Sequence, residues 1–235
     1  GQGLLGGESE PANPDSDAFD FWSLKPVVRH ALPALGQADR DWARNPIDHF
    51  IAAKLAEKNL THSLEANRRT LIRRVYYDLI GLPPDPSEID TFLSDSDPLA
   101  YEKLVEKLLA TPGYGERWAR HWLDVVHYGD THGYDKDKLR LIAWPYRDYV
   151  IRSLNADKPY SQFLMEQIAG DELLDFSDPA QITPQHVENL IATGFLRMAH
   201  DGTGSDVVNS VPERMEVVAD EIDIFSSTVL GLTMK

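Results

Sequence analysis

Apolar residues recur at intervals of three and four along most of the chain, which is the spacing of one face of an α-helix. Asn45 followed by Pro46 is typical of a helix start, because asparagine caps free backbone N–H groups and proline is tolerated in the first turn. Gly81 followed by Pro83 and Pro84 is typical of a helix end. These signals predict a first helix that begins at residue 45 and carries an apolar stripe as far as residue 55. A second helix is predicted from residue 65 or 67 to residue 79. Further helices are predicted at 86–93, 98–109, 112–128, 144–154, 160–169, 184–198 and 212–230.

Each apolar stripe predicts which side of its helix is buried. No stretch alternates between apolar and polar residues for long enough to predict a β-strand. The predicted fold class is therefore all-α, an irregular multi-helix bundle with short loops rich in proline and glycine. The side chains expected in the interior include Ile47, Phe50, Ile51, Ala52 and Leu55, then Leu71, Ile72, Val75, Tyr76 and Leu79, then Leu104, Val105 and Leu108, and finally Met215, Val218, Ile222, Phe225 and Val229.

The first twenty residues differ from the rest of the chain. They are rich in Gly, Pro, Asp, Ser and Glu and carry no apolar periodicity, so residues 1–20 are predicted to be a flexible leader or interdomain linker. Pro26 and Pro33 keep the segment from Lys25 to Ala34 extended, because proline disfavours a helix interior. Residues 21–235 are then expected to form the all-α domain.

Composition excludes several classes of protein. Hydrophobic residues make up 42% of the chain and charged residues 26%, values typical of a globular protein. The 38 acidic residues oppose 23 basic ones, and a net charge of −15 argues against broad binding to nucleic acid or to anionic membranes. No run approaches the ~18–20 apolar residues that span a bilayer, so no membrane span is predicted.

The absence of cysteine from the sequence excludes the most chemistry. These residues hold no disulfide, no thiolate nucleophile, no cysteine-based metal site and no covalent attachment point for haem. The sequence also lacks the glycine-rich phosphate loops, the nucleophile elbow and the H-E-x-x-H zinc motif. No standard nucleophile or cofactor site can therefore be identified from motifs.

Residues 114–128 form the densest segment of aromatic and charged residues. Trp118, Trp122 and Val125 share one side of the predicted helix and are expected in the core. His121 lies on an adjacent side and could act as an acid, a base or a ligand. The structural alternative is that this polar side of the helix forms hydrogen bonds with the backbone of a neighbouring segment. His127 lies near the helix end, where a protonated imidazole would interact favourably with the helix dipole.

Asp124 on this helix and Arg147 on a later one suggest a third use of the segment. Arg147 could pair with Asp124 across the helices, as part of a buried salt-bridge network. A hydrolase or oxidoreductase using His121, Asp124 and Arg147 is an alternative, although no arrangement in the sequence requires catalysis.

The loop that follows, residues 130–137, alternates oxygen donors around a glycine. Asp130, His132, Asp135 and Asp137 are candidate metal ligands, because a hard cation such as calcium needs several converging oxygen atoms. The loop does not meet the EF-hand pattern. A transition-metal site using His127, His132 and an aspartate, and a solvated acidic turn, remain as alternatives.

Several ordered motifs carry a resemblance to a known family. They are residues 45–51, 69–84 and 114–124, extended by 144–148 and 170–173. The chain resembles the planctomycete cytochrome-C-associated domain of unknown function, from about Phe21 to Lys235. That domain occurs in large exported bacterial proteins, often after a cytochrome-c-like domain, so the resemblance implies a periplasmic or otherwise exported protein.

The resemblance also implies a cofactor. Residues 228–235 are similar to the family segment that leads into a Cys-x-x-Cys-His motif, so the domain is expected to be truncated at its C-terminus, with haem c attached beyond Lys235. This part of the protein would then offer a wall of the haem site or a distal ligand, from His127, Met198, His200 or Met234. His127 and His132 stand where the family pattern leads us to expect arginine and asparagine.

Two functions of different classes follow. The first is a module of a multidomain c-type cytochrome-like protein that supports electron transfer. Its partners would be a cytochrome-c-like domain and the remaining C-terminal part of the protein or another chain. The second is a carbohydrate- or protein-binding module without redox activity, which a cation stabilises in the loop at 130–137.

Overall fold

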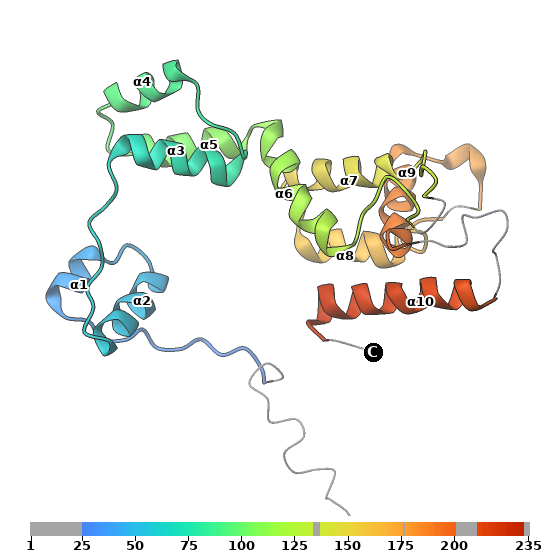
Figure 1. Ribbon diagram of the computed structural model, residues 1–235, viewed down its shortest axis with the longest axis horizontal. Coiled ribbons are helices and arrows are strands. Elements are labelled where there is room, and N and C mark those ends of the chain that lie inside the picture. The colour runs from blue at the N-terminus through green and yellow to red at the C-terminus, as the bar shows by residue number, and fades with distance from the viewer. Residues whose placement is uncertain (1–24, 134–136, 176, 201–210, 233–235) are drawn as a thin grey trace, which may run out of the picture. The chain divides into compact units, whose positions relative to one another are not determined.

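The computed structural model describes residues 25–133, 137–175, 177–200 and 211–232, and within them it contains ten α-helices and no β-strand. The predicted all-α class is therefore confirmed (Figure 1). The predicted leader lies outside the described residues. The α-helices are α1 (Gln37–Trp42), α2 (Pro46–Glu57), α3 (Arg68–Leu79), α4 (Pro86–Ser94), α5 (Ala100–Leu109), α6 (Pro112–Val125), α7 (Trp144–Asn155), α8 (Tyr160–Ala169), α9 (Pro184–Ala192) and α10 (Val211–Phe225).

The helix boundaries follow the capping residues that the sequence shows. The Asn45 side chain accepts hydrogen bonds from the backbone N–H groups of Ile47 and Asp48, and the Asp48 carboxylate accepts in return from the backbone of Asn45. The helix α3 begins after Asn67, whose side chain accepts a hydrogen bond from the backbone N–H of Thr70. It ends before Gly81, whose φ of 74° is easily adopted only by glycine.

Three features of the helices were not predicted. The short helix α1 was missed, because six mostly polar residues show no apolar periodicity. The predicted helix 184–198 is divided, since α9 ends at Ala192 and continues as a 3-10 helix, η3 (Thr193–Arg197). The last helix likewise changes, after Phe225, into a π-helix (Ser226–Leu230). None of the described helices has the length and the apolar character to cross a membrane.

The chain divides into two compact units, residues 1–65 and 66–235. The described part of the first unit contains α1 and α2, and α2 buries only Ala52. Ile47, Phe50 and Ile51 were expected in the interior, but they are 68%, 41% and 47% exposed. That prediction is wrong because periodicity identifies an apolar face and does not supply a partner to cover it.

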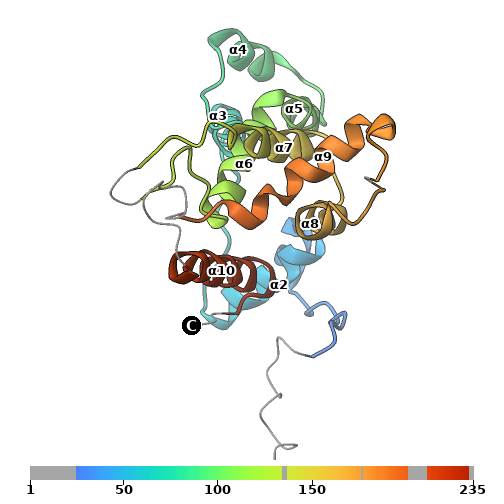
Figure 2. The ribbon, with the colours of Figure 1, turned by 90° about the vertical axis from the view of Figure 1, so that its right-hand side faces the viewer.

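The second unit has two clusters of buried apolar side chains. The smaller one is formed by α3, α4 and α5, and its members include Ile72, Val75 and Leu108. The predicted inner faces of α3 and α5 are therefore confirmed. The larger cluster draws on α6 to α10 and on η3, and Figure 2 shows α6 and α7 side by side within it.

The contact between α6 and α7 depends on small residues. Gly115 and Ala119 are the buried residues of α6. A Cβ atom on Gly115 would lie 2.6 Å from the side chain of Asn155, which accepts a hydrogen bond from the Gly115 backbone. Trp118 and Val125 remain 40% and 45% exposed, so the prediction that they lie in the core is wrong. The helices approach closely along the small residues, Trp122 packs against the larger cluster, and Trp118 and Val125 are left at the edge.

Candidate functional site

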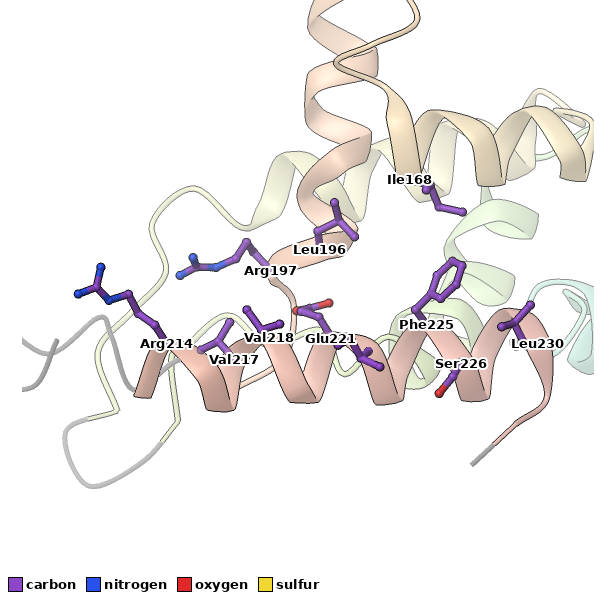
Figure 3. Close-up of a pocket in the computed structure, with 11 residues that line it drawn as sticks. Ile168, Leu196, Arg197, Arg214, Val217, Val218, Glu221, Phe225, Ser226 and Leu230 are labelled. Atoms are coloured by element: carbon purple, nitrogen blue, oxygen red, sulfur yellow. The ribbon is translucent and has the colours of Figure 1, made fainter. Parts of the chain in front are cut away.

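A groove runs along α10, between that helix on one side and α8 and η3 on the other (Figure 3). We call it the α10 groove. Its volume is about 650 Å³. Its apolar walls include Ile168 of α8, Leu196 of η3, and Val218, Ile222, Phe225 and Leu230 on or just after α10. Its polar lining residues are Arg197, Arg214, Glu221 and Ser226.

The sequence of α10 explains why the groove is apolar. Val217 and Ile224 are buried, and they attach the helix to the rest of the second unit. Val218 and Ile222 lie on a neighbouring face and are 48% and 49% exposed. They were expected in the interior, and that prediction is wrong. They line the groove instead, because the apolar surface of α10 is wider than the surface its neighbours cover.

Glu221 is the unusual residue of the groove. Its Oε1 accepts a hydrogen bond from the backbone N–H of Ala199 at 3.4 Å. Its Oε2 is buried and has no hydrogen-bond partner within the part of the chain that the structure describes. Burial raises the pKa of this carboxyl to about 7, although Ala199, Arg197 and Arg140 act in the opposite direction. Glu221 therefore exchanges a proton near neutral pH.

Arg140 fixes the backbone that faces Glu221. Its guanidinium donates one hydrogen bond to the carbonyl of Met198 at 2.8 Å and another to the carbonyl of Ala199. The loop that carries Arg140 is closed by two backbone bonds, from His132 to Lys138 and from Arg140 to Asp130. Arg140 thus joins the segment before α7 to the residues that follow η3.

Three of the four predicted haem ligands lie in different surroundings, and the fourth, Met234, lies outside the described residues. Met198 is buried in the larger core cluster and does not line the α10 groove. His200 packs against Gly133, where an added Cβ atom would lie 2.7 Å from its imidazole ring. His127 lies just after α6, is exposed and has a positive φ of 56°. The three side chains are not brought together around the groove.

The predicted metal loop is described only in part, because Asp135 lies outside the described residues. The Asp130 carboxylate accepts a hydrogen bond from the hydroxyl of Tyr128 at 2.6 Å, and that of Asp137 accepts one from the backbone of Gly133 at 3.0 Å. Burial, and then the Asp130 carboxylate, raise the pKa of the Tyr128 hydroxyl. No group of three or more metal-binding side chains occurs among the described residues. The calcium site and the cation-stabilised binding module remain predictions.

The predicted catalytic residues are not assembled into a site. His121 and Asp124 are exposed on α6, and the His121 ring contacts that of Trp118 at 5.3 Å between centroids. Arg147 forms an ion pair with its neighbour Asp148 at 2.9 Å. The suggested pairing of Arg147 with Asp124 is thus replaced by a local one.

Sequence reasoning missed Glu221, although a signal was present. The residues three and four positions away on both sides of it are all apolar, namely Val217, Val218, Ile224 and Phe225. A carboxylate surrounded in this way lies within the apolar face of its helix. Such a residue is expected to have a perturbed pKa.

One comparison with known proteins identifies a family. The family model PSCyt2, described as a protein of unknown function (DUF1549), matches residues 46–235. No curated protein and no solved structure matches the chain. The matched residues include the whole α10 groove, and the family resemblance predicted from the sequence is confirmed.

Proposed function

The chain belongs to the PSCyt2 family of proteins of unknown function (DUF1549), and from this premise we propose that it is a redox module of an exported, multidomain c-type cytochrome-like protein. In this proposal the α10 groove walls a haem that another segment of the same protein, or another chain, holds covalently. The cytochrome-c-like domain expected from the family resemblance is its electron-transfer partner.

The observation that carries the proposal is the polarity of the α10 groove. Its volume of about 650 Å³ lies in the range of cofactor sites, roughly 300–1,000 Å³. Apolar side chains line most of it, and Figure 3 shows Arg197 and Arg214 toward the end opposite Leu230. A haem is a flat apolar ring with two carboxylates at one edge, and arginine is well suited to bind carboxylates.

The groove fits the ring and its carboxylates, but it does not provide a ligand for the iron. No histidine or methionine occurs among its described lining residues. A c-type haem brings a histidine from its own attachment segment. Bound here, it would supply one-electron transfer. The chain's own residues would exclude water from one face of the ring and hold its carboxylates, which are two of the means by which a protein sets a haem potential.

A haem peptide tests this proposal directly. A short peptide with covalently attached c-type haem and its own histidine is titrated with the chain, and the Soret band is recorded. We expect a shifted band and saturable binding. Val218→Asp places a charge in the groove and is expected to weaken binding by about tenfold or more, since burying an unpaired charge is costly.

Val187→Asp is the matched control. Val187 on α9 and Val218 on α10 are 46% and 48% exposed, but only Val218 lines the groove. Circular dichroism establishes that both variants keep their helices. Equal binding by the two variants, or no saturable binding by the unaltered chain, would refute the proposal.

A further inference from the structure

The α10 groove contains a polar atom that has no hydrogen-bond partner among the residues that the structure describes. The Oε2 atom of Glu221 is buried, and its neighbours in the groove are mainly apolar. Figure 3 shows the Glu221 carboxyl turned into the groove, between α10 and η3. A buried carboxyl oxygen without a hydrogen bond is costly, and proteins contain few such atoms. Its position therefore calls for a functional explanation.

Positive groups lie at one end of the groove. Arg197 projects from η3 and Arg214 from the first turns of α10, and both line the groove. The remainder of the wall, toward Phe225 and Leu230, is apolar apart from Ser226. The groove thus has a cationic end and an apolar end, which is complementary to an elongated or flat apolar molecule with an acidic group.

We propose that the α10 groove binds apolar ligands that carry an acidic group, and that each binding event is coupled to uptake of a proton by Glu221. This inference rests on the proposed function for the location of the site, and it adds the charge class of the ligand and a proton linkage. It does not require the ligand to be haem.

The coupling follows from the charged groups around Glu221. Arg197 faces it from η3, and Arg140 faces it from the segment before α7; both favour its ionised form. Asp220, its neighbour on α10, opposes ionisation. On α7, Tyr146 is uncharged near neutral pH, because burial above all raises the pKa of its hydroxyl.

An acidic ligand changes this balance in two ways. Its acidic group interacts with Arg197, and so weakens the attraction that favours the ionised form of Glu221. Its apolar body displaces water from the groove, which makes the charged carboxylate costlier still. A protonated Glu221 avoids repulsion and can donate a hydrogen bond from Oε2 to an oxygen of the ligand. Both effects raise the pKa of Glu221 further from its value of about 7 in the empty groove.

Two fluorescent dyes test the inference. Anilinonaphthalene sulfonate has an apolar body and a strong acid that stays ionised throughout, so the dye itself does not titrate. Anilinonaphthalene has the same body without the sulfonate. We expect the sulfonate to bind more tightly at about pH 6, and its affinity to fall about tenfold for each pH unit above roughly 7, as linkage to one proton requires. Arg214→Gln should weaken only the sulfonate.

Glu221→Gln should make the affinity for the sulfonate independent of pH, because the amide cannot ionise. Glu216→Gln is the matched control, since Glu216 is an exposed residue of α10 outside the groove lining, and it should retain the dependence. Calorimetry of the unaltered chain, in two buffers of different ionisation enthalpy, measures the proton uptake directly. We expect close to one proton per dye above neutral pH.

The outcomes separate this inference from the proposed function. Affinity for the sulfonate that is constant between about pH 6 and pH 9, or no proton uptake in calorimetry, would overturn the inference even if the haem peptide binds. If the sulfonate binds with the expected pH dependence but the haem peptide does not bind, the haem proposal is overturned and this inference stands. A Glu221→Gln variant that keeps the pH dependence would also overturn it.

Discussion

Two glutamates in the second unit have buried carboxyl oxygens in contrasting surroundings. Glu166 on α8 is 2% exposed, and both of its carboxylate oxygens are hydrogen-bonded. It accepts from the hydroxyl of Tyr149 at 2.8 Å, from the amide of Gln162 at 2.8 Å and from the ammonium group of Lys158. Within the described residues, Glu221 accepts only the long hydrogen bond from the backbone N–H of Ala199. Glu166 is therefore a buried charge whose hydrogen bonds stabilise the fold, whereas Glu221 keeps a carboxyl oxygen with which a ligand could form a hydrogen bond.

The two pKa values move in opposite directions for physical reasons. Burial favours the neutral form of both carboxyls. At Glu166 the bonds from Lys158, Gln162 and Tyr149 outweigh burial, and its pKa is lowered. At Glu221 burial prevails, and its pKa is raised to about 7. A fully satisfied carboxylate indicates a structural role, whereas an unsatisfied one in a groove indicates a site for a ligand.

Removal of the ammonium group beside Glu166 should have the largest effect. Lys158→Met leaves a buried carboxylate without its counter-ion and is expected to cost about 3–5 kcal/mol of unfolding free energy. Urea denaturation followed by circular dichroism measures it. Lys103→Met is the control, because Lys103 and its partner Asp97 form an exposed ion pair, and solvent screening leaves such a pair with little effect on stability. Equal losses in the two variants would contradict the role assigned to Glu166.

The same substitution at both glutamates should then give different results. Glu166→Gln replaces charge-assisted hydrogen bonds with neutral ones and is expected to cost about 1.5–3 kcal/mol. Glu221→Gln, measured at about pH 8, should cost nothing or stabilise the fold, because it removes a poorly paired buried charge. Urea denaturation of both variants in one buffer makes the comparison. A larger loss of unfolding free energy in Glu221→Gln than in Glu166→Gln would contradict the contrast between the two glutamates.

The backbone near Glu166 should also resist change. Gly170 follows α8, and a Cβ atom there would lie 2.3 Å from the carbonyl oxygen of Asn189 on α9. Gly170→Ala must therefore separate the two helices and is expected to cost about 1–3 kcal/mol. Gly113→Ala on α6 is the control, since its Cβ atom would find ordinary contacts at 3.5 Å. Thermal unfolding of both variants tests the difference. A stable Gly170→Ala variant would show that α8 and α9 are not held rigidly.

The sequence was sufficient to predict the helices and most of their boundaries, because capping residues act locally. Asn45 and Asn67 cap the helices that follow them, as expected. It was less informative about burial. The stripes of α3 and α5 are covered by each other and by α4, whereas much of the stripe of α10 faces the groove. Periodicity predicts an apolar face, but the packing of other helices decides whether it is buried.

The candidate site was harder to predict for the same reason. The surroundings of Glu221 depend on the hydrogen bonds that Arg140 donates to the carbonyls of Met198 and Ala199. These two residues follow Arg140 by about sixty positions in the chain. No local pattern encodes a contact of that kind. Met198 was selected for its thioether, yet it contributes its backbone oxygen. The family resemblance implied a wall for a cofactor, but the α10 groove on which the proposed function rests could be located only from the structure.

The smallest predicted effect concerns the dependence of stability on pH. The pKa of Glu221 is raised from 4.5 to about 7 on folding, so the folded state binds the proton more tightly than the unfolded state between those values. Stability should therefore fall as pH rises through this window and change no further above it. The pKa of Glu166 is lowered, so its contribution is lost only at more acidic pH. Between about pH 5 and pH 8 the two glutamates can thus be distinguished.

Melting temperatures at about pH 5.5 and pH 7.5 measure the effect. The unaltered chain should lose roughly 2–4 °C more than Glu221→Gln between the two conditions. That difference corresponds to about 1 kcal/mol for a chain of this size, roughly half of what the full pKa shift would give, because solvent screens a partly exposed carboxyl. Glu216→Gln should behave like the unaltered chain, because its carboxylate is exposed on the same helix. Other titrating groups contribute equally to all three proteins and cancel in the comparison. A Glu221→Gln variant with the same loss as the unaltered chain would mean that water reaches Glu221, and the contrast with Glu166 would then disappear.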